Sequence, residues 1–288
     1  MNDYHNLKQG EKGAWISIAA YLILAIVKLT VASIGQSEAL RADGLNNTTD
    51  VVASIAVLIG LKISRKPPDK DHHYGHFRAE TIASLVAAFI MMTVGIEVLV
   101  GTFQGILSGE TNEPALLTAW TAIGAAIVMI GVYRYNLKLS QKVNSQALKA
   151  AAQDNKSDAL VSIGAAVGIF GSQFGVAWLD PLAGFIVGLI ICKTAWDIFT
   201  ESSHSLTDGF DEEEIETIRN TISAHPDVLS VRDVKARLQG NRTLVDAIIH
   251  VDPHMTIQEG HDITDELEEK LEEEHGIYYA HIHIEPYE

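Results

Sequence analysis

Four oxygen-bearing side chains in two apolar stretches have the spacing of a cation site. The stretch 153–170 carries Asp154 and Asp158 near its start, and a second stretch begins with Asn46 and Asp50. Within each pair the residues are four apart, so in a helix they lie on one face, one turn apart. In a bilayer each buried carboxylate costs a few kcal/mol and has to be paired or hold a cation. Two such helices, face to face, would gather three carboxylates and one amide oxygen around one point.

The charge of the chain is concentrated in its last part. The 288 residues carry a formal net charge of −16 and are 47% hydrophobic. Residues 208–288 contain 21 acidic and 6 basic residues, a net of −15, whereas residues 1–207 contain 16 acidic and 15 basic residues. A nearly neutral apolar part followed by an acidic polar part predicts a membrane domain with a soluble tail. An acidic tail does not suit nucleic acid, so we expect no nucleic-acid partner.

Six apolar runs are long enough to cross a hydrocarbon core of about 30 Å. We place them at residues 14–34, 42–63, 77–107, 115–139, 146–173 and 182–199. Pro67 and Pro68 end the second run, and Asp180 with Pro181 forms a break before the sixth. Buried helices of a soluble protein are the alternative, but six consecutive runs of this length are rare in soluble cores. The first residues have no signal-peptide pattern, so the first run is expected to remain as an anchor.

The distribution of basic residues predicts the orientation in the membrane. Lysines and arginines flank the start of the chain, the loop between spans two and three, and the loop between spans four and five. The other loops have Arg41 and little else. Six spans place both termini on one side, and basic loops stay in the cytoplasm. We therefore predict a multi-pass protein of the cell membrane, in contact with lipid, with both termini cytoplasmic.

The tail has the periodicity of a small α+β domain. Residues 211–224 and 256–275 have the pattern of amphipathic helices, and residues 228–238, 243–251 and 277–285 have that of strands. The order αββαβ is that of a ferredoxin-like sheet. We therefore predict two domains, a six-helix transmembrane domain at residues 1–207 and a cytoplasmic ferredoxin-like domain at residues 208–288.

Taken together, these features resemble the cation diffusion facilitator family. The resemblance rests on six spans, NxxxD in the second, DxxxD in the fifth, a His/Asp loop after the second, and the αββαβ tail. Members of the family are homodimers that expel divalent metal from the cytoplasm in exchange for protons. The resemblance implies the same here, with no enzymatic activity and no organic cofactor. By position, Asn46, Asp50, Asp154 and Asp158 match the intramembrane transport site of the family.

Simpler interpretations of these four residues are an interhelical hydrogen bond for Asn46 and a helix cap for an acid near a helix start. Two neighbours, Asp43 and Asn47, match no role in the family. We expect Asp43 to face the water outside the membrane.

The identity of the four candidate ligands bears on the metal. Three carboxylates and an amide form an all-oxygen set, which suits Mn²⁺, Mg²⁺ or Ca²⁺, whereas imidazole and thiolate suit zinc. Zinc-carrying members of the family have a histidine in this quartet, usually at the position of Asp154. The DxxxD motif in the fifth span of this chain instead resembles the manganese branch of the family. Chemistry and resemblance together predict Mn²⁺ as the transported substrate. Fe²⁺ is the nearest alternative, followed by Zn²⁺ and Co²⁺.

The loop after the second span offers a second candidate metal site. Asp69, His72 and His76 have ligand spacing and match a cytoplasmic-loop site of the family. A solvated polar loop is the alternative. Arg78 and Asp208 match, loosely, an ion pair that family members have near the junction of membrane and tail.

The tail offers a third candidate site, for which the resemblance is less complete. The candidate ligands are His250, His261, His283 and Glu285. Two positions at which zinc-carrying relatives have histidines are Arg232 and Ile248 here. We therefore expect one tail site or none, rather than a two-metal cluster.

Two other classes of membrane protein compete with a transporter. A metal sensor would bind the ion without moving it, and flux into vesicles would separate the two. A metal-dependent hydrolase would need a nucleophile–base pair or a motif such as HExxH, which we do not find in the sequence. No ATP-binding motif is present either, so we expect a secondary transporter rather than a pump.

Overall fold

The computed structural model describes residues 2–64, 66–108, 113–143, 146–239, 242–277 and 279–287. The chain forms two compact units. One unit comprises Met1–Ala56 and Val86–Ile198, and the other comprises Val57–Leu85 and Phe199–Glu288.

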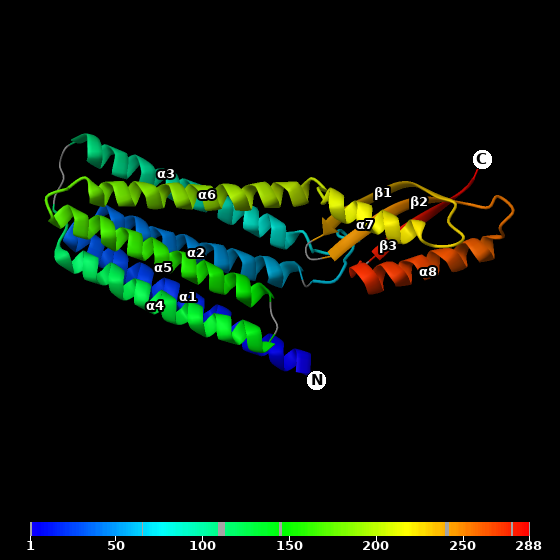
Figure 1. The fold of residues 1–288 in the computed structure, drawn as a ribbon, viewed down its shortest axis with the longest axis horizontal. Helices are drawn as coiled ribbons and strands as arrows, with labels where there is room; N and C mark the ends of the chain where they lie inside the picture. Colours follow the sequence, from blue (N-terminus) through cyan, green and yellow to red (C-terminus); the bar gives the residue numbers. More distant parts are fainter. Residues whose placement is uncertain are drawn as a thin grey trace. The chain divides into compact units, whose positions relative to one another are not determined.

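All six apolar runs form long helices in the described residues (Figure 1). They are α1 (Asn2–Gly35), α2 (Glu38–Ser64), α3 (Ala79–Ser108), α4 (Leu116–Val143), α5 (Gln146–Gln173) and α6 (Leu179–Leu206). The predicted break before the sixth run is wrong by one turn, because Asp180 and Pro181 lie inside the first turn of α6. Proline is tolerated there since the first amide groups of a helix have no intrahelical acceptor.

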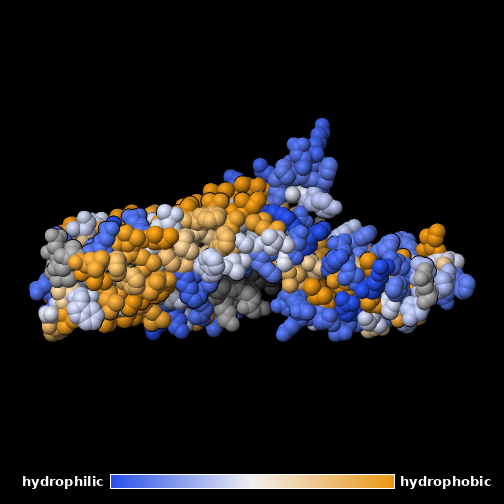
Figure 2. All heavy atoms as spheres, turned by 90° about the horizontal axis from the view of Figure 1, so that it is seen from above, coloured by the Kyte–Doolittle hydropathy of each residue, from blue (hydrophilic) through white to orange (hydrophobic). Residues whose placement is uncertain are grey.

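Within the described residues, five of these helices are long and apolar enough to cross a membrane, namely α1, α2, α3, α4 and α6. The exception is α5, which carries Asp154, Lys156 and Asp158 in its first half. Large apolar side chains such as Ile23, Phe89 and Trp120 are exposed on the other long helices. Figure 2 shows the resulting hydrophobic surface over the long helices, which is the surface that lipid requires.

Close approach of the helices depends on small residues. A cluster of buried residues that includes Ala32, Ala119 and Ala165 joins α1, α4 and α5. A Cβ atom on Gly168 of α5 would lie only 2.4 Å from Cβ of Ala183 in α6. Small residues allow helix backbones to approach closely where lipid provides no hydrophobic driving force. Polar side chains on facing helices can therefore reach one another directly.

The tail forms the predicted αββαβ arrangement. Its elements are α7 (Glu212–Ser223), β1 (Ser230–Gln239), β2 (Arg242–Val251), α8 (Ile257–His275) and β3 (Tyr279–Pro286). The strand order is β1-β2-β3, with β1 antiparallel and β3 parallel to β2. The side chain of Asp211 caps α7, and Thr256 with Glu259 forms a capping box at the start of α8. Together with the transmembrane helices, this confirms the predicted fold class.

One face of the sheet is apolar and the other is polar. Val245, Ala247 and Ile249 of β2 alternate into a core that also contains Ile222 of α7 and Leu267 of α8. Side chains at the alternate positions, such as Asp246 and His283, are exposed. A β-bulge in β1 falls between Val231 and Asp233, at Arg232. The candidate tail ligands lie on this polar face or on α8.

Candidate metal centre

Helices α2 and α5 bring three of the four candidate transport ligands into contact. The amide Nδ2 of Asn46 donates a hydrogen bond of 3.0 Å to Oδ1 of Asp158 and a weaker one of 3.4 Å to Oδ2 of Asp50. Asn46 and Asp158 are buried, and Asp50 is half-buried. Oδ2 of Asp158 is buried and accepts no hydrogen bond from the described residues. A buried carboxylate oxygen that accepts no hydrogen bond is available to bind a cation.

Asp154 lies one turn before Asp158, at the exposed end of this group. Among the described residues, no hydrogen bond joins its carboxylate to the other three side chains. The carboxylate oxygens of the three aspartates do not converge to within 4.8 Å of one another. To hold one ion together, these side chains would have to move closer.

The Asn46 amide makes the interhelical hydrogen bond that was one interpretation of this residue. Its N–H₂ group faces two carboxylates, which is the position that a cation would take. An amide binds a metal through its oxygen, so Asn46 would have to turn about its Cβ–Cγ bond to become a ligand. The same side chain therefore bridges the two carboxylates through its N–H₂ group and, after this rotation, would offer its oxygen atom to a cation.

The expectation that Asp43 faces outer water is wrong. Asp43 is fully buried, and its Oδ1 lies 2.8 Å from the Nζ atom of Lys28 in α1, which is also fully buried. A lysine in an apolar span needs a buried partner of opposite charge, and the facing side of α2 provides one. The sequence showed both residues but not that they share an interface.

A second polar network holds α5 one turn before Asp158. Asn155 accepts hydrogen bonds from Asn136 of α4 at 2.9 Å and from Ser17 of α1 at 3.2 Å. Its Nδ2 donates to the hydroxyl of Tyr21 at 2.6 Å, and this hydroxyl lies close to the Asp158 carboxylate. Asp158 is therefore carried by a helix that neighbouring helices hold through specific hydrogen bonds. Sequence reasoning missed these residues because single polar residues in apolar runs do not reveal their partners.

The loop residues Asp69, His72 and His76 converge. Among the described residues they are the one group of three or more histidine, cysteine or acidic side chains whose ligand atoms all lie within 4.8 Å of one another. Asp69 Oδ1 lies 3.0 Å from His72 Nδ1, and Asp69 Oδ2 lies 3.4 Å from His76 Nε2. The hydrogen bond from His72 lowers the pKa of the Asp69 carboxyl below its usual value. An ionised carboxylate and two imidazoles make a mixed site that many divalent metals accept.

The loop is fastened to the strands of its own unit. The side-chain amide of Gln239 donates to the carbonyl of Tyr74 at 3.3 Å, and the guanidinium of Arg242 stacks 4.0 Å above the ring of Phe77. Arg78, directly before α3, forms the expected ion pair with Asp208.

In the tail, three of the four candidate ligands lie around Glu285. His250 Nε2 is 3.4 Å and His283 Nε2 is 3.8 Å from its carboxylate oxygens. His261 is not part of this group, since it lies on α8 beside Asp265. Arg232 occupies the position beside Glu285 that a metal ion would take, because its Nη1 lies 2.5 Å from Oε2 of this glutamate. This arginine is the main reason that the pKa of Glu285 is lowered.

Comparison with known proteins identifies the family. Residues 14–207 match the cation efflux transmembrane domain, and residues 210–287 match the cytoplasmic domain of cation efflux proteins. The chain belongs to the cation efflux family, which is the cation diffusion facilitator family. It is therefore a multi-pass membrane transporter of metal cations and not an enzyme, as the sequence predicted.

Several Bacillus subtilis proteins are similar to this cation efflux protein over nearly its whole length. It is 56% identical to the manganese efflux system protein MneS, over 100% of this chain and 99% of the relative. It is 54% identical to the uncharacterized transporter YdbO, over 99% of each chain. It is 33% identical to the manganese efflux system protein MneP, over 96% of each chain.

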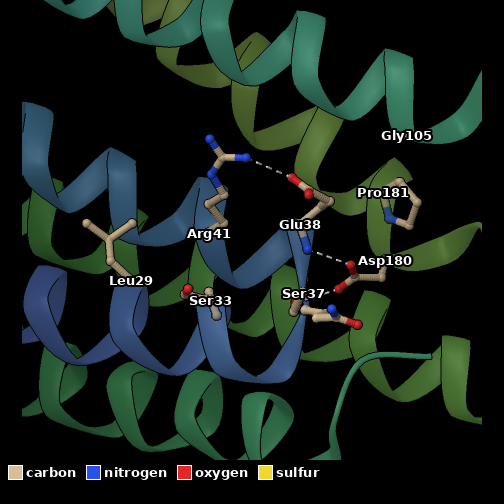
Figure 3. A pocket seen from close by; sticks show the side chains of 10 residues that line it. Leu29, Ser33, Ser37, Glu38, Arg41, Gly105, Asp180 and Pro181 are labelled. Atoms are coloured by element: carbon tan, nitrogen blue, oxygen red, sulfur yellow. Dashed lines mark hydrogen bonds and ion pairs between the residues drawn. The ribbon is translucent and has the colours of Figure 1, made fainter. Parts of the chain in front are cut away.

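The cation efflux protein also has a pocket of about 400 Å³ at the start of α2, away from the aspartate quartet. Figure 3 shows Asp180 of α6 directed at the first turn of α2. Its carboxylate accepts 2.7 Å and 2.6 Å hydrogen bonds from the Glu38 amide and the Ser37 hydroxyl. Asp180 thus caps α2 from another helix, whereas the sequence suggested only a break at this residue.

Proposed function

We propose that this cation efflux protein exports Mn²⁺ from the cytoplasm in exchange for protons and that it works as a homodimer. The observation that carries the proposal is the contact among Asn46, Asp50 and Asp158, with Asp154 one turn away. We assign these four residues as the transport ligands. The similar proteins MneS and MneP are manganese efflux system proteins, which supports the same metal.

The ligand set favours manganese over zinc. The sequence contains no histidine between residues 6 and 71 or between residues 77 and 203, so the long helices that carry the quartet offer no imidazole. Its single cysteine, Cys192, lies on α6, whereas the quartet lies on α2 and α5. Carboxylate and amide oxygens suit Mn²⁺ better than Zn²⁺, relative to sites with nitrogen or sulfur. We expect Fe²⁺ to be the strongest competitor, since its ligand preferences differ least from those of Mn²⁺.

Proton exchange follows from the chemistry of the ligands. Carboxylates must be deprotonated to bind a metal ion, so metal binding releases whatever protons they carry. Protons arriving from outside would then favour release of the metal. The excess of basic residues around the chain start and two loops supports cytoplasmic termini and a cytoplasmic tail, with the domains dividing near residue 207.

The proposed homodimer would use the tail. Both tail helices pack on one face of the three-stranded sheet, which leaves the polar face available to a second copy. We propose the loop cluster as a further metal site, because its three candidate ligands converge. We expect the tail cluster to hold no metal in the wild-type protein, since His261 lies apart from it and Arg232 pairs with Glu285.

The test of the proposed function is metal flux into proteoliposomes. Mn²⁺, Fe²⁺, Zn²⁺ and Co²⁺ would be offered separately, with a proton gradient and with a pH-sensitive dye inside the vesicles. We expect Mn²⁺ to accumulate with proton movement in the opposite direction, and to do so faster than Zn²⁺. Flux that prefers Zn²⁺, or Mn²⁺ flux that does not respond to the proton gradient, would contradict the proposal.

A further inference from the structure

A buried lysine, Lys28, contacts Asn47, which in turn contacts Asp50 of the proposed transport site. Lys28 is fully buried, and its ammonium group contacts three oxygen atoms. These are Asp43 Oδ1 at 2.8 Å, Asn47 Oδ1 at 2.7 Å and Ser162 Oγ at 2.9 Å. An ammonium group donates three hydrogen bonds, so each N–H of Lys28 has one acceptor. A buried charge with a complete set of partners has one defined position.

The partners of Lys28 lie on the two helices that carry the quartet. Asp43 and Asn47 are on α2, and Asn47 directly follows Asn46. Ser162 is on α5, one turn after Asp158, and its hydroxyl donates to Asp43 at 3.2 Å. Lys28 itself comes from α1, so a single side chain joins three helices beside the proposed metal site.

Lys28 determines which way the Asn47 amide points. Because the amide oxygen accepts from the ammonium group, the N–H₂ group is left to face Asp50, with Nδ2 at 3.5 Å from its Oδ2. The reverse orientation would bring two N–H donors against an ammonium group that has no acceptor, which is unfavourable. Lys28 thereby keeps the amide oxygen of Asn47 away from the proposed metal position. The N–H₂ group of Asn47 is directed at the carboxylate of Asp50, which is a proposed metal ligand.

We infer that Lys28 is a positioning residue of the proposed metal site and acts on Asp50 through Asn47. This inference rests on the proposed function of the quartet. It differs from a purely structural role, in which the Lys28–Asp43 pair only joins α1 to α2. A structural pair would affect folding and leave the affinity for metal unchanged, whereas a positioning residue changes the affinity of correctly folded protein.

The experiment removes the ion pair without leaving a buried charge. In Lys28→Met/Asp43→Leu both charges are replaced by apolar side chains, a change that is often neutral or stabilising for buried pairs. We would compare it with Asn47→Leu and with the triple variant in proteoliposomes. Thr102→Val is the matched control, since Thr102 is a buried hydroxyl on α3 that bonds the Val98 and Leu99 carbonyls of its own helix.

We expect the double variant to raise the KM for Mn²⁺ about tenfold with little change in maximal rate, within the range of couplings measured in shared hydrogen-bond networks. Asn47→Leu should raise KM by a similar factor, and the triple variant should be no worse than either, because all three changes remove one chain of contacts. Thr102→Val should match wild type. A wild-type KM for the folded double variant, or additive effects in the triple variant, would overturn the inference.

A second measurement separates this inference from the proposed function. Equilibrium binding of Mn²⁺ in detergent, measured by calorimetry on full-length protein in which His72→Ala removes the proposed loop site, does not depend on transport. If wild type binds Mn²⁺ but moves none, the proposed function fails, and the dissociation constants of the same variants still decide the role of Lys28. Equal dissociation constants for wild type and the double variant would refute that role.

Discussion

The helical site and the tail site bring carboxylates and partner side chains together in different ways. In the helical site, the neutral amide of Asn46 donates hydrogen bonds to both Asp50 and Asp158. In the tail, Glu285 is paired with the charged guanidinium of Arg232. A divalent cation could enter the helical site by turning an amide. In the tail it would have to displace a positive charge that makes a charge-assisted hydrogen bond. The helical cluster can thus open by rotation of one neutral side chain, whereas the tail cluster already holds the cationic side chain of Arg232.

The largest expected effect comes from Asp158. Asp158→Ala removes the one quartet carboxylate that is both buried and bonded to Asn46, and no neighbouring acid can replace it. Loss of a residue that only hydrogen-bonds to a metal ligand lowers metal affinity or activity roughly 10–100-fold. Because Asp158 is a proposed ligand itself, we expect the flux of every metal to fall by more than this. Vesicle flux, normalised to folded protein, is the measurement. Asp197→Ala is the control, because Asp197 is an exposed acid on α6 that pairs with Lys193 along its own helix. Retained Mn²⁺ flux in Asp158→Ala would show that the quartet is not the transport site.

The next effect concerns metal preference at Asp154. Asp154→His would convert the all-oxygen set into a mixed set with one imidazole, which zinc accepts in four-coordinate sites. We expect the ratio of Mn²⁺ to Zn²⁺ flux to fall about tenfold, in keeping with the preference of imidazole for zinc. Because Asp154 is exposed, the substitution should leave folding unchanged. An unchanged ratio would mean that Asp154 is not a ligand and that selectivity arises elsewhere.

Much of the fold and of the candidate site could be predicted from the sequence, because the signals for them are local. The bounds of α5, the order of the tail elements and the paired four-residue spacings each depend on residues close together in the chain. The partnerships of Lys28 with Asp43, of Asp180 with the first turn of α2, and of Arg232 with Glu285 join distant segments. A single sequence does not show which helix faces meet. One signal was available, since a lone lysine in an apolar span requires an acid, and Asp43 had no other role.

A smaller effect should follow from opening the tail site. Arg232→Ala frees Glu285, with His250 and His283 beside it, and should create a site with two imidazoles and one carboxylate. We expect tail affinity for Zn²⁺ to rise about tenfold, as removal of one competing neighbour of a ligand can change affinity by that order. Calorimetry on full-length protein carrying Asp158→Ala and His72→Ala would separate the tail from both the transport site and the proposed loop site. Mn²⁺ flux of the single variant Arg232→Ala should stay within about twofold of wild type, because the transport ligands are unchanged. Unchanged Zn²⁺ affinity would mean that Arg232 does not block this cluster.

The smallest effect is the pH dependence of the Arg232–Glu285 pair itself. The arginine lowers the pKa of Glu285 in the folded tail below its ordinary value of 4.5. A carboxyl whose folded pKa is lowered stabilises the fold above its unfolded pKa, and this contribution is lost as the pH falls through the lowered folded value. The coupling between Arg232→Ala and Glu285→Gln in a double-mutant cycle of thermal unfolding should therefore be present at pH 7, decrease as the pH falls below the ordinary value of 4.5, and vanish below the lowered pKa. Because both side chains are partly exposed, high salt should weaken the coupling as well. The protein would be treated with chelator first, so that metal at His250 and His283 does not contribute. A coupling that does not decrease as the pH is lowered from 7 until the tail unfolds would mean that the pair is held by packing rather than by charge, and the contrast with the neutral amide of Asn46 would then lose its basis.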